Sequence, residues 1–414
     1  MRKIISIVLL ILIIQTSVLV CGCSDNSSVS DSKSDAVAQV DYSNDMQIMY
    51  RVTGRSYITK SDDGYYYIGD DEIIIYIDKN TKKATPLCSK PNCTHTDMDT
   101  CDAYINMIEN QLSAIQYNNG YLYAVCGEYD QSYIKYNTYL MRMNTDGSQR
   151  ENITGYFDFY PLEWFIHRGY FYCSTDSAIF RIPLDSPKSE PEVLFETECY
   201  IESTYRSVQK LYAYENYLYF YACEKNDNDE GPGTSYNCIN LDTLEIKALP
   251  KINDNLLSYH FFLDDTLIAS YYDEEADENI FLKCDFEGNV KEEFFIKDHS
   301  DILTYSTDGK YIYADNGVGV IIDKSEQQII KVYDLNMNEI DSYVPPKVKA
   351  AAHTWLSPQD NEYLIFESVN NDGERILVMA DKSQIGSLNG EPIEYTELCK
   401  LDWAEKEYNW VTLD

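Results

Sequence analysis

The sequence predicts an all-β fold, a seven-bladed β-propeller. A unit of turn, alternating strand, turn and second strand recurs seven times along the chain. The turns return at intervals of roughly 45–56 residues, which is typical of propeller blades with four strands. Tyrosine is used heavily, at 38 of 414 residues, whereas the spacing of apolar residues that marks helices is scarce. The structural alternatives are an open solenoid or a pair of sandwiches.

The N-terminal residues predict export from the cytoplasm. A charged start at residues 1–3 precedes an apolar run at residues 4–20, the order found in a secretory signal peptide. The run is short for a membrane span, and polar residues at 15–17 interrupt it. We therefore expect residues 1–22 to be a cleaved signal peptide.

Residues 20–24 read VCGCS, which resembles the lipobox of bacterial lipoproteins, where a small residue precedes the cysteine that becomes the lipidated N-terminus. Gly22 before Cys23 fits this pattern, and Val20 before Cys21 fits it poorly. The resemblance implies a lipid on Cys23 and anchoring to the extracytoplasmic face of the cell membrane. The alternative is an ordinary secretory signal whose two cysteines carry no lipid.

The residues that follow predict a flexible tether and then one large domain. Residues 23–40 are rich in serine and aspartate and have too little apolar surface to fold. No second linker of this composition follows, so residues 41–414 are expected to form one propeller domain. The net charge of −36 argues against nucleic acid as a partner and favours solubility.

The clearest copy of the repeat spans residues 118–154. A turn at 118–120 feeds the alternating strand 121–125, and a second strand at 138–143 ends in the turn 144–147, Asn-Thr-Asp-Gly. Such turns need residues that accept a positive φ angle, which asparagine and glycine do. Alternation places one face of each strand against each neighbouring blade.

The other six copies follow the same order more loosely. They begin at residues 62, 168, 217, 264, 308 and 361. A propeller ring also has to be closed, and two segments are candidates for completing the last blade, residues 46–51 and residues 408–412. The sequence does not choose between them.

Residues 139–148, YLMRMNTDGS, resemble the "strand, then Asn-x-Asp-Gly" unit of low-density-lipoprotein-receptor-type (YWTD-like) propellers. Residues 169–185 resemble it more loosely. The same unit occurs in bacterial lipoproteins with a domain of unknown function. The resemblance implies a propeller with a binding role and carries over no catalytic residue. The literal Tyr-Trp-Thr-Asp tetrapeptide is absent from this sequence.

One dense group of metal-binding residue types lies between the first two copies. It contains Cys88, Cys93, His95 and Cys101, and the Pro-Asn pair at 91–92 predicts a turn that brings the first two together. Three cysteines and one histidine match a tetrahedral zinc site in type, although their spacing differs from that of the usual fingers. Outside the cytoplasm a disulfide is the default, so a disulfide, a metal site and free thiols all remain open.

Cys223 and Cys238 form a second candidate pair. They lie on consecutive predicted strands of one blade and would form a disulfide if the strand register agreed. The alternative for this pair, and the expectation for every cysteine in a predicted strand, is a small buried apolar residue. These cysteines are Cys126, Cys173, Cys223, Cys238 and Cys284.

No motif for catalysis or nucleotide binding occurs in the sequence. We therefore expect a binding protein without catalytic activity, which recognises a protein or glycan partner. The first alternative is an extracytoplasmic lyase or hydrolase acting on carbohydrate, and the second is a structural subunit of an envelope complex. No cofactor is expected, with zinc at Cys88, Cys93, His95 and Cys101 as the alternative.

Overall fold

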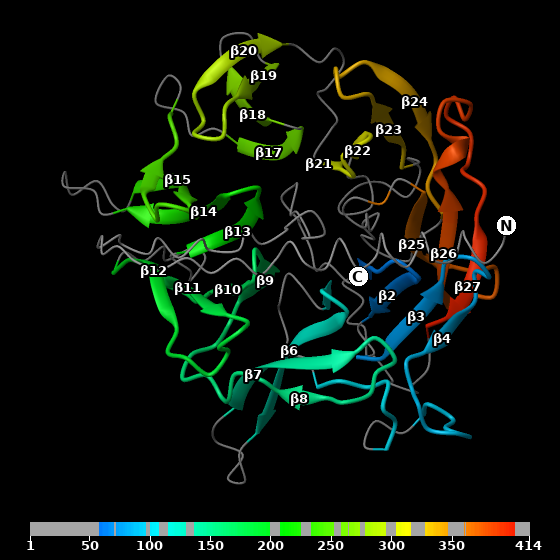
Figure 1. Ribbon diagram of the computed structural model, residues 1–414. Helices are drawn as coiled ribbons and strands as arrows, with labels where there is room; N and C mark the ends of the chain where they lie inside the picture. The colour runs from blue at the N-terminus through cyan, green and yellow to red at the C-terminus, as the bar shows by residue number, and fades with distance from the viewer. Residues whose placement is uncertain are drawn as a thin grey trace, which may run out of the picture. The chain divides into compact units, whose positions relative to one another are not determined.

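The computed structural model (Figure 1) describes residues 58–69, 72–96, 100–106, 115–129, 136–198, 208–224, 233–251, 258–263, 265–273, 278–294, 304–315, 328–346, 360 and 362–401. The predicted signal peptide, Cys23, the predicted tether and both candidate segments for closing the ring lie outside these residues. Among the described residues, no helix has the length and apolar character needed to cross a membrane.

Seven small antiparallel sheets are arranged around a ring (Figure 1). Six of them have four strands in sequence order, and the seventh has three described strands. The seven-bladed β-propeller predicted from the repeats is thus confirmed. We number the blades 1 to 7 along the chain.

Blade 1 contains β1 (Ile58–Lys60), β2 (Gly64–Ile68), β3 (Ile74–Asp78) and β4 (Ala84–Pro86). Blade 2 contains β5 (Gln116–Asn118), β6 (Tyr121–Tyr129), β7 (Tyr136–Asn144) and β8 (Glu151–Asn152). Blade 3 contains β9 (Glu163–His167), β10 (Tyr170–Ser174), β11 (Ala178–Pro183) and β12 (Glu192–Glu196), and blade 4 contains β13 (Val208–Tyr214), β14 (Tyr217–Glu224), β15 (Gly233–Asn240) and β16 (Ile246–Ala248). Blade 5 contains β17 (Ser258–Leu263), β18 (Thr266–Asp273), β19 (Glu278–Cys284) and β20 (Val290–Phe294). Blade 6 contains β21 (Thr304–Thr307), β22 (Ile312–Asp315), β23 (Ile330–Tyr333) and β24 (Glu339–Tyr343). Blade 7 contains β25 (Tyr363–Val369), β26 (Arg375–Asp381) and β27 (Thr396–Lys400). The 3₁₀ turn η1 (Lys382–Gln384) follows β26.

The outer turn of blade 2 shows why the repeat needs its asparagine and glycine. Gly147 has φ +80°, a region that side chains rarely adopt, and its N–H donates to the carbonyl of Asn144 at 2.9 Å. The Asn144 N–H in turn donates to the carbonyl of Ser148 at 2.9 Å. A Cβ on Gly147 would lie 2.8 Å from the carbonyl oxygen of Leu87, beyond the last strand of blade 1. The turn therefore requires glycine both for its conformation and for its packing on blade 1.

Buried apolar side chains fill the joints between blades all the way around the ring. One cluster runs from blade 3 to blade 7, a second joins blades 2 and 3, and a third joins blades 7, 1 and 2. In the third cluster Leu377 and Met379 of β26 pack with Ile58 and Tyr67 of blade 1. Strand β27 lies next to β4, so the described strands of blade 7 include its outer edge (Figure 1). The first and last blades therefore meet through packed side chains.

A buried ionic network also joins blades 6, 7 and 1. The ammonium of Lys382 pairs with the carboxylate of Asp308 and donates to the backbone carbonyl of Asp360. Asp308 accepts a further hydrogen bond from the hydroxyl of Tyr313 at 2.8 Å. The carboxylate of Asp360 accepts from the ammonium of Lys60 at 3.1 Å. The two ammonium groups balance the two carboxylates, which lowers the cost of burying Lys382, Asp308 and Asp360.

Candidate metal centre

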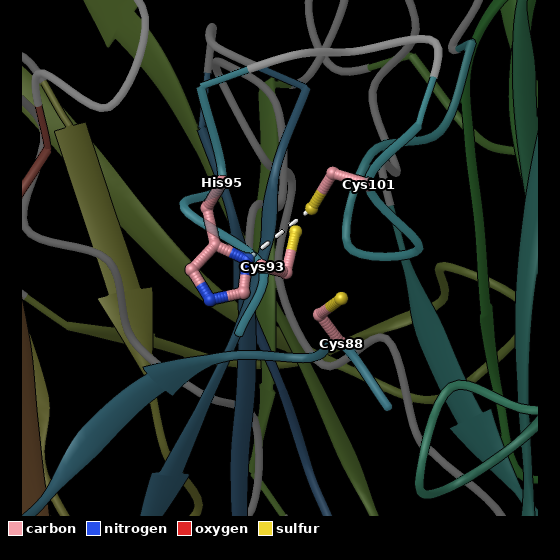
Figure 2. Close-up of side chains that lie close together, drawn as sticks. All are labelled: Cys88, Cys93, His95 and Cys101. Atoms are coloured by element: carbon pink, nitrogen blue, oxygen red, sulfur yellow. Dashed lines mark hydrogen bonds between the residues drawn. The ribbon is translucent and has the colours of Figure 1, made fainter. Parts of the chain in front are cut away.

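The four residues grouped by the sequence also come together in space. Cys88, Cys93, His95 and Cys101 lie on the segment that leaves β4 and leads toward blade 2 (Figure 2). The three Sγ atoms and a ring nitrogen of His95 all lie within 4.8 Å of one another. Within the described ranges no other group of three or more such ligand residues is this compact.

The first half of the segment is a tight turn, as the Pro-Asn pair predicts. The N–H of Cys93 donates a hydrogen bond to the carbonyl of Lys90 at 3.4 Å. Asn92 and His95 both have positive φ, of 60° and 59°. Asparagine and histidine accept this conformation more readily than most residues. The turn thereby places the side chains of Cys93 and His95 beside Cys88.

The second half of the segment is held against blade 1. Residues 103–105 run antiparallel to residues 72–74, with hydrogen bonds of 2.8 and 3.0 Å and a bridge between Ile73 and Tyr104. The hydroxyl of Tyr104 donates to the carbonyl of His95 at 3.1 Å. These contacts fix the position of Cys101, which is buried.

Blade 2 supplies a further support that the sequence analysis missed. The guanidinium of Arg150 donates to the carbonyl of Tyr104 at 2.7 Å and to the carbonyl of Asp102. It also donates to the carbonyl of Gly147 at 3.2 Å, in its own turn. Because 48 residues separate Arg150 from Asp102, nothing in the local sequence indicates this contact. The segment is thus clamped between blades 1 and 2.

The electrostatic surroundings of the thiols differ from one to the next. Burial alone would raise the pKa of Cys88, but backbone N–H groups at Lys90 and Asp102 favour its thiolate, and its pKa is lowered. Burial raises the pKa of Cys101 to about 12. The N–H of Ala103, which donates to the Sγ of Cys101 at 3.4 Å, acts in the opposite direction and lowers this pKa. An ion pair of 2.8 Å between Lys90 and Asp102 lies beside them.

This arrangement can bind a cation through four soft or borderline donors. The Nδ1 of His95 lies 3.3 Å from the Sγ of Cys101, and Cys88, Cys93 and Cys101 are all free thiols. A closed set of four protein ligands is typical of structural zinc sites, whereas catalytic sites leave one position for water or substrate. The geometry therefore suits a structural role.

The strand register does not place Cys223 and Cys238 opposite each other, so the condition for a disulfide between them is not met. In the β14–β15 hairpin Cys223 lies opposite Thr234, and Cys238 lies opposite Tyr219, so the two cysteines are four positions out of register. Cys238 is a free thiol, whereas Cys223 is disulfide-bonded.

The other strand cysteines agree with their predicted role. Cys126, Cys173 and Cys284 are buried free thiols. Burial raises the pKa of Cys126 and of Cys284 to about 12, so these thiols stay neutral. They pack as small apolar side chains.

No family model matches the sequence, and no curated protein matches it. The resemblance to receptor-type propellers and to bacterial lipoproteins therefore stays a prediction.

Solved structures show a likeness in fold. A prolyl endopeptidase aligns with a TM-score of 0.49 at 12% identity, over 85% of this chain and 50% of its own. Porphyromonas gingivalis dipeptidyl peptidase 4 aligns with a TM-score of 0.39 at 9% identity, over 84% of this chain and 53% of its own. A eukaryotic initiation factor aligns with a TM-score of 0.43 at 11% identity, over 83% of this chain and 87% of its own. Since all three scores are below 0.5, the fold assignment rests on the strand pairing itself.

Proposed function

We propose that this chain is a lipid-anchored extracytoplasmic protein whose propeller binds a protein or glycan partner. The signal-like residues 1–22, Cys23 in its lipobox-like setting and the polar tether of residues 23–40 support the anchoring. The acidic net charge of −36 makes nucleic acid an unsuitable partner.

The observation that carries the binding role is the exposure of two tyrosines on the segment between blades 2 and 3. Tyr156 is 55% exposed and Tyr160 is 39% exposed, although many of the tyrosine and phenylalanine side chains in the described part of the chain are buried. The ring of Tyr156 stands edge-on to that of Tyr139, with centroids 5.8 Å apart, and its hydroxyl donates to the carboxylate of Glu128.

Held in this way, the Tyr156 ring presents apolar area at little cost in side-chain entropy. Tyrosines of this kind are enriched where proteins bind partners, because the ring is apolar and the hydroxyl forms hydrogen bonds. The neighbouring carboxylate of Glu128 supplies an acceptor for a polar group of the partner.

Binding is tested by capturing partners from detergent-solubilised membranes with the full-length protein. The double variant Tyr156→Ala, Tyr160→Ala is compared with Tyr395→Ala, which removes a tyrosine of similar exposure (46%) from blade 7. We expect the double variant to retain about 30-fold less partner, as for the loss of about 2 kcal/mol at an interface hot spot. The control should bind as the wild type does. Equal capture by the double variant and the wild type would contradict a binding role for these two tyrosines.

Anchoring is tested separately with a clickable fatty-acid label in the bacterial host. Cys23→Ser should lose the label and leave the membrane fraction, whereas Cys21→Ser should keep both. Labelling of the Cys23→Ser variant at the wild-type level would contradict the lipid anchor.

A further inference from the structure

We propose that Cys88, Cys93, His95 and Cys101 bind one zinc ion in a closed tetrahedral site that fastens the segment between blades 1 and 2. This inference is independent of the partner-binding role proposed above. It rests on the geometry of four side chains, on the hydrogen bonds around them and on the position of the segment in the ring.

The distances leave room for one ion at the centre. Ligands about 2.0–2.3 Å from a tetrahedral zinc ion lie roughly 3.3–3.8 Å from one another. In this structure the Nδ1 of His95 and the Sγ of Cys101 are 3.3 Å apart, and all four donor atoms lie within 4.8 Å of one another (Figure 2). Shifts of about 1 Å in side-chain position are therefore enough to complete the coordination.

The donor types select zinc. Thiolate and imidazole are ligands for zinc and copper, and the group contains no oxygen donor of the kind that calcium and magnesium require. Four protein ligands leave no open position, so the ion would serve the structure and not a reaction.

The surroundings suit a zinc–thiolate centre. The N–H of Ala103 donates to the Sγ of Cys101, and backbone N–H groups at Lys90 and Asp102 serve Cys88. Such hydrogen bonds hold the thiolates in place and stabilise their charge. Three thiolates around Zn²⁺ leave a net charge of −1, and the cations of Lys90 and Arg150 lie close enough to interact with Cys88.

The position of the site between blades 1 and 2 indicates what the ion would stabilise. Residues 103–105 pair with blade 1, and Arg150 of blade 2 holds the same stretch from the other side. The ion would join Cys101 of this stretch to Cys88, directly after β4. Metal binding would therefore be coupled to the docking of blade 2 on blade 1, because the docked segment brings the ligands together.

The test is the zinc content of the untagged full-length protein, measured by mass spectrometry of the metal. We expect about one zinc ion per chain in the wild type and at least about tenfold less in Cys93→Ser and in His95→Asn. Asparagine keeps the positive φ of position 95 while removing the imidazole. The matched control is Cys399→Ser, a partly buried thiol of blade 7 outside the cluster, which should keep full zinc content.

Two measurements on the wild type decide the question even if the variants fail to fold. X-ray absorption should show three sulfur ligands at about 2.3 Å and one nitrogen ligand at about 2.0–2.1 Å from zinc. Alkylation without reduction, read by peptide mass, should find no disulfide among Cys88, Cys93 and Cys101. A disulfide between any two of them, or a chain that stays metal-free after incubation with one equivalent of zinc, would overturn the proposal.

Discussion

Replacing Lys382 with methionine should destabilise the propeller far more than its position in a surface turn suggests. Lys382 is 1% exposed and its partner Asp308 is 0% exposed, so the change leaves a buried carboxylate without its cation. Breaking such a pair costs about 3–5 kcal/mol. Asp308 keeps the hydroxyl of Tyr313 and the N–H groups of residues 310 and 311, all at 2.8 Å, so we expect about 3 kcal/mol.

The assay is thermal unfolding followed by calorimetry, with Lys331→Met as the control. Lys331 and Glu339 form an exposed pair at 3.6 Å, which should contribute only about 0.2–1 kcal/mol. For a domain this large, about 2 °C per kcal/mol is expected, so Lys382→Met should lower Tm by about 6 °C. The double variant Lys382→Met, Asp308→Asn should recover part of the loss, because no unpaired charge then remains buried.

Equal Tm values for Lys382→Met and Lys331→Met would refute this reasoning. The same holds if the Asp308→Asn change adds its full cost to that of Lys382→Met, since that result would mean that the two side chains do not interact.

Two further predictions concern single turns. Gly147→Ala should lower the free energy of unfolding by more than about 1 kcal/mol, because the added Cβ meets the Leu87 carbonyl. The control is Gly155→Ala, since Gly155 also has φ +80° but has open space around it, and this change should cost only the backbone strain. Thermal melts of both variants check this. Burial would raise the pKa of Asp341, but the backbone N–H groups of Gly386, Leu388 and Asn389 donate to its carboxylate and lower the pKa. The stability that this carboxylate contributes is therefore present above the unfolded pKa near about 3.9 and is lost as pH falls through the folded value. Asp341→Asn should therefore reduce the dependence of Tm on pH in the acid range, and an unchanged dependence would contradict the assignment.

The blades could be predicted from the sequence because each one is defined locally. The turn at 144–147 and the alternation along 121–125 lie within one hairpin, and both are visible as residue types. The joints between blades depend on residues far apart in the chain. The pairing of Lys382 with Asp308 spans 74 residues, and no local sequence pattern indicates it.

The grouping of Cys88, Cys93, His95 and Cys101 could be predicted for the same local reason, since they lie within one segment. Its support by Arg150 was missed, because that contact depends on how blade 2 packs on blade 1. The register of Cys223 could not be read from the sequence, because it depends on how β14 pairs with β15, which places Cys223 opposite Thr234.

The joint between the first and last blades has a consequence for the order of folding. Lys60 and Asp360 are 300 residues apart, and Tyr67 donates across the same joint to Glu367. Closing a loop of this length costs about 1.6 kcal/mol more than closing one of about 50 residues, the size of one blade. Contacts this distant in sequence form late, once neighbouring blades have already docked. Until blade 7 has been synthesised, the apolar side chains of Ile58 and Tyr67 lack the side chains that cover them, and a chain truncated before that point would expose this apolar surface.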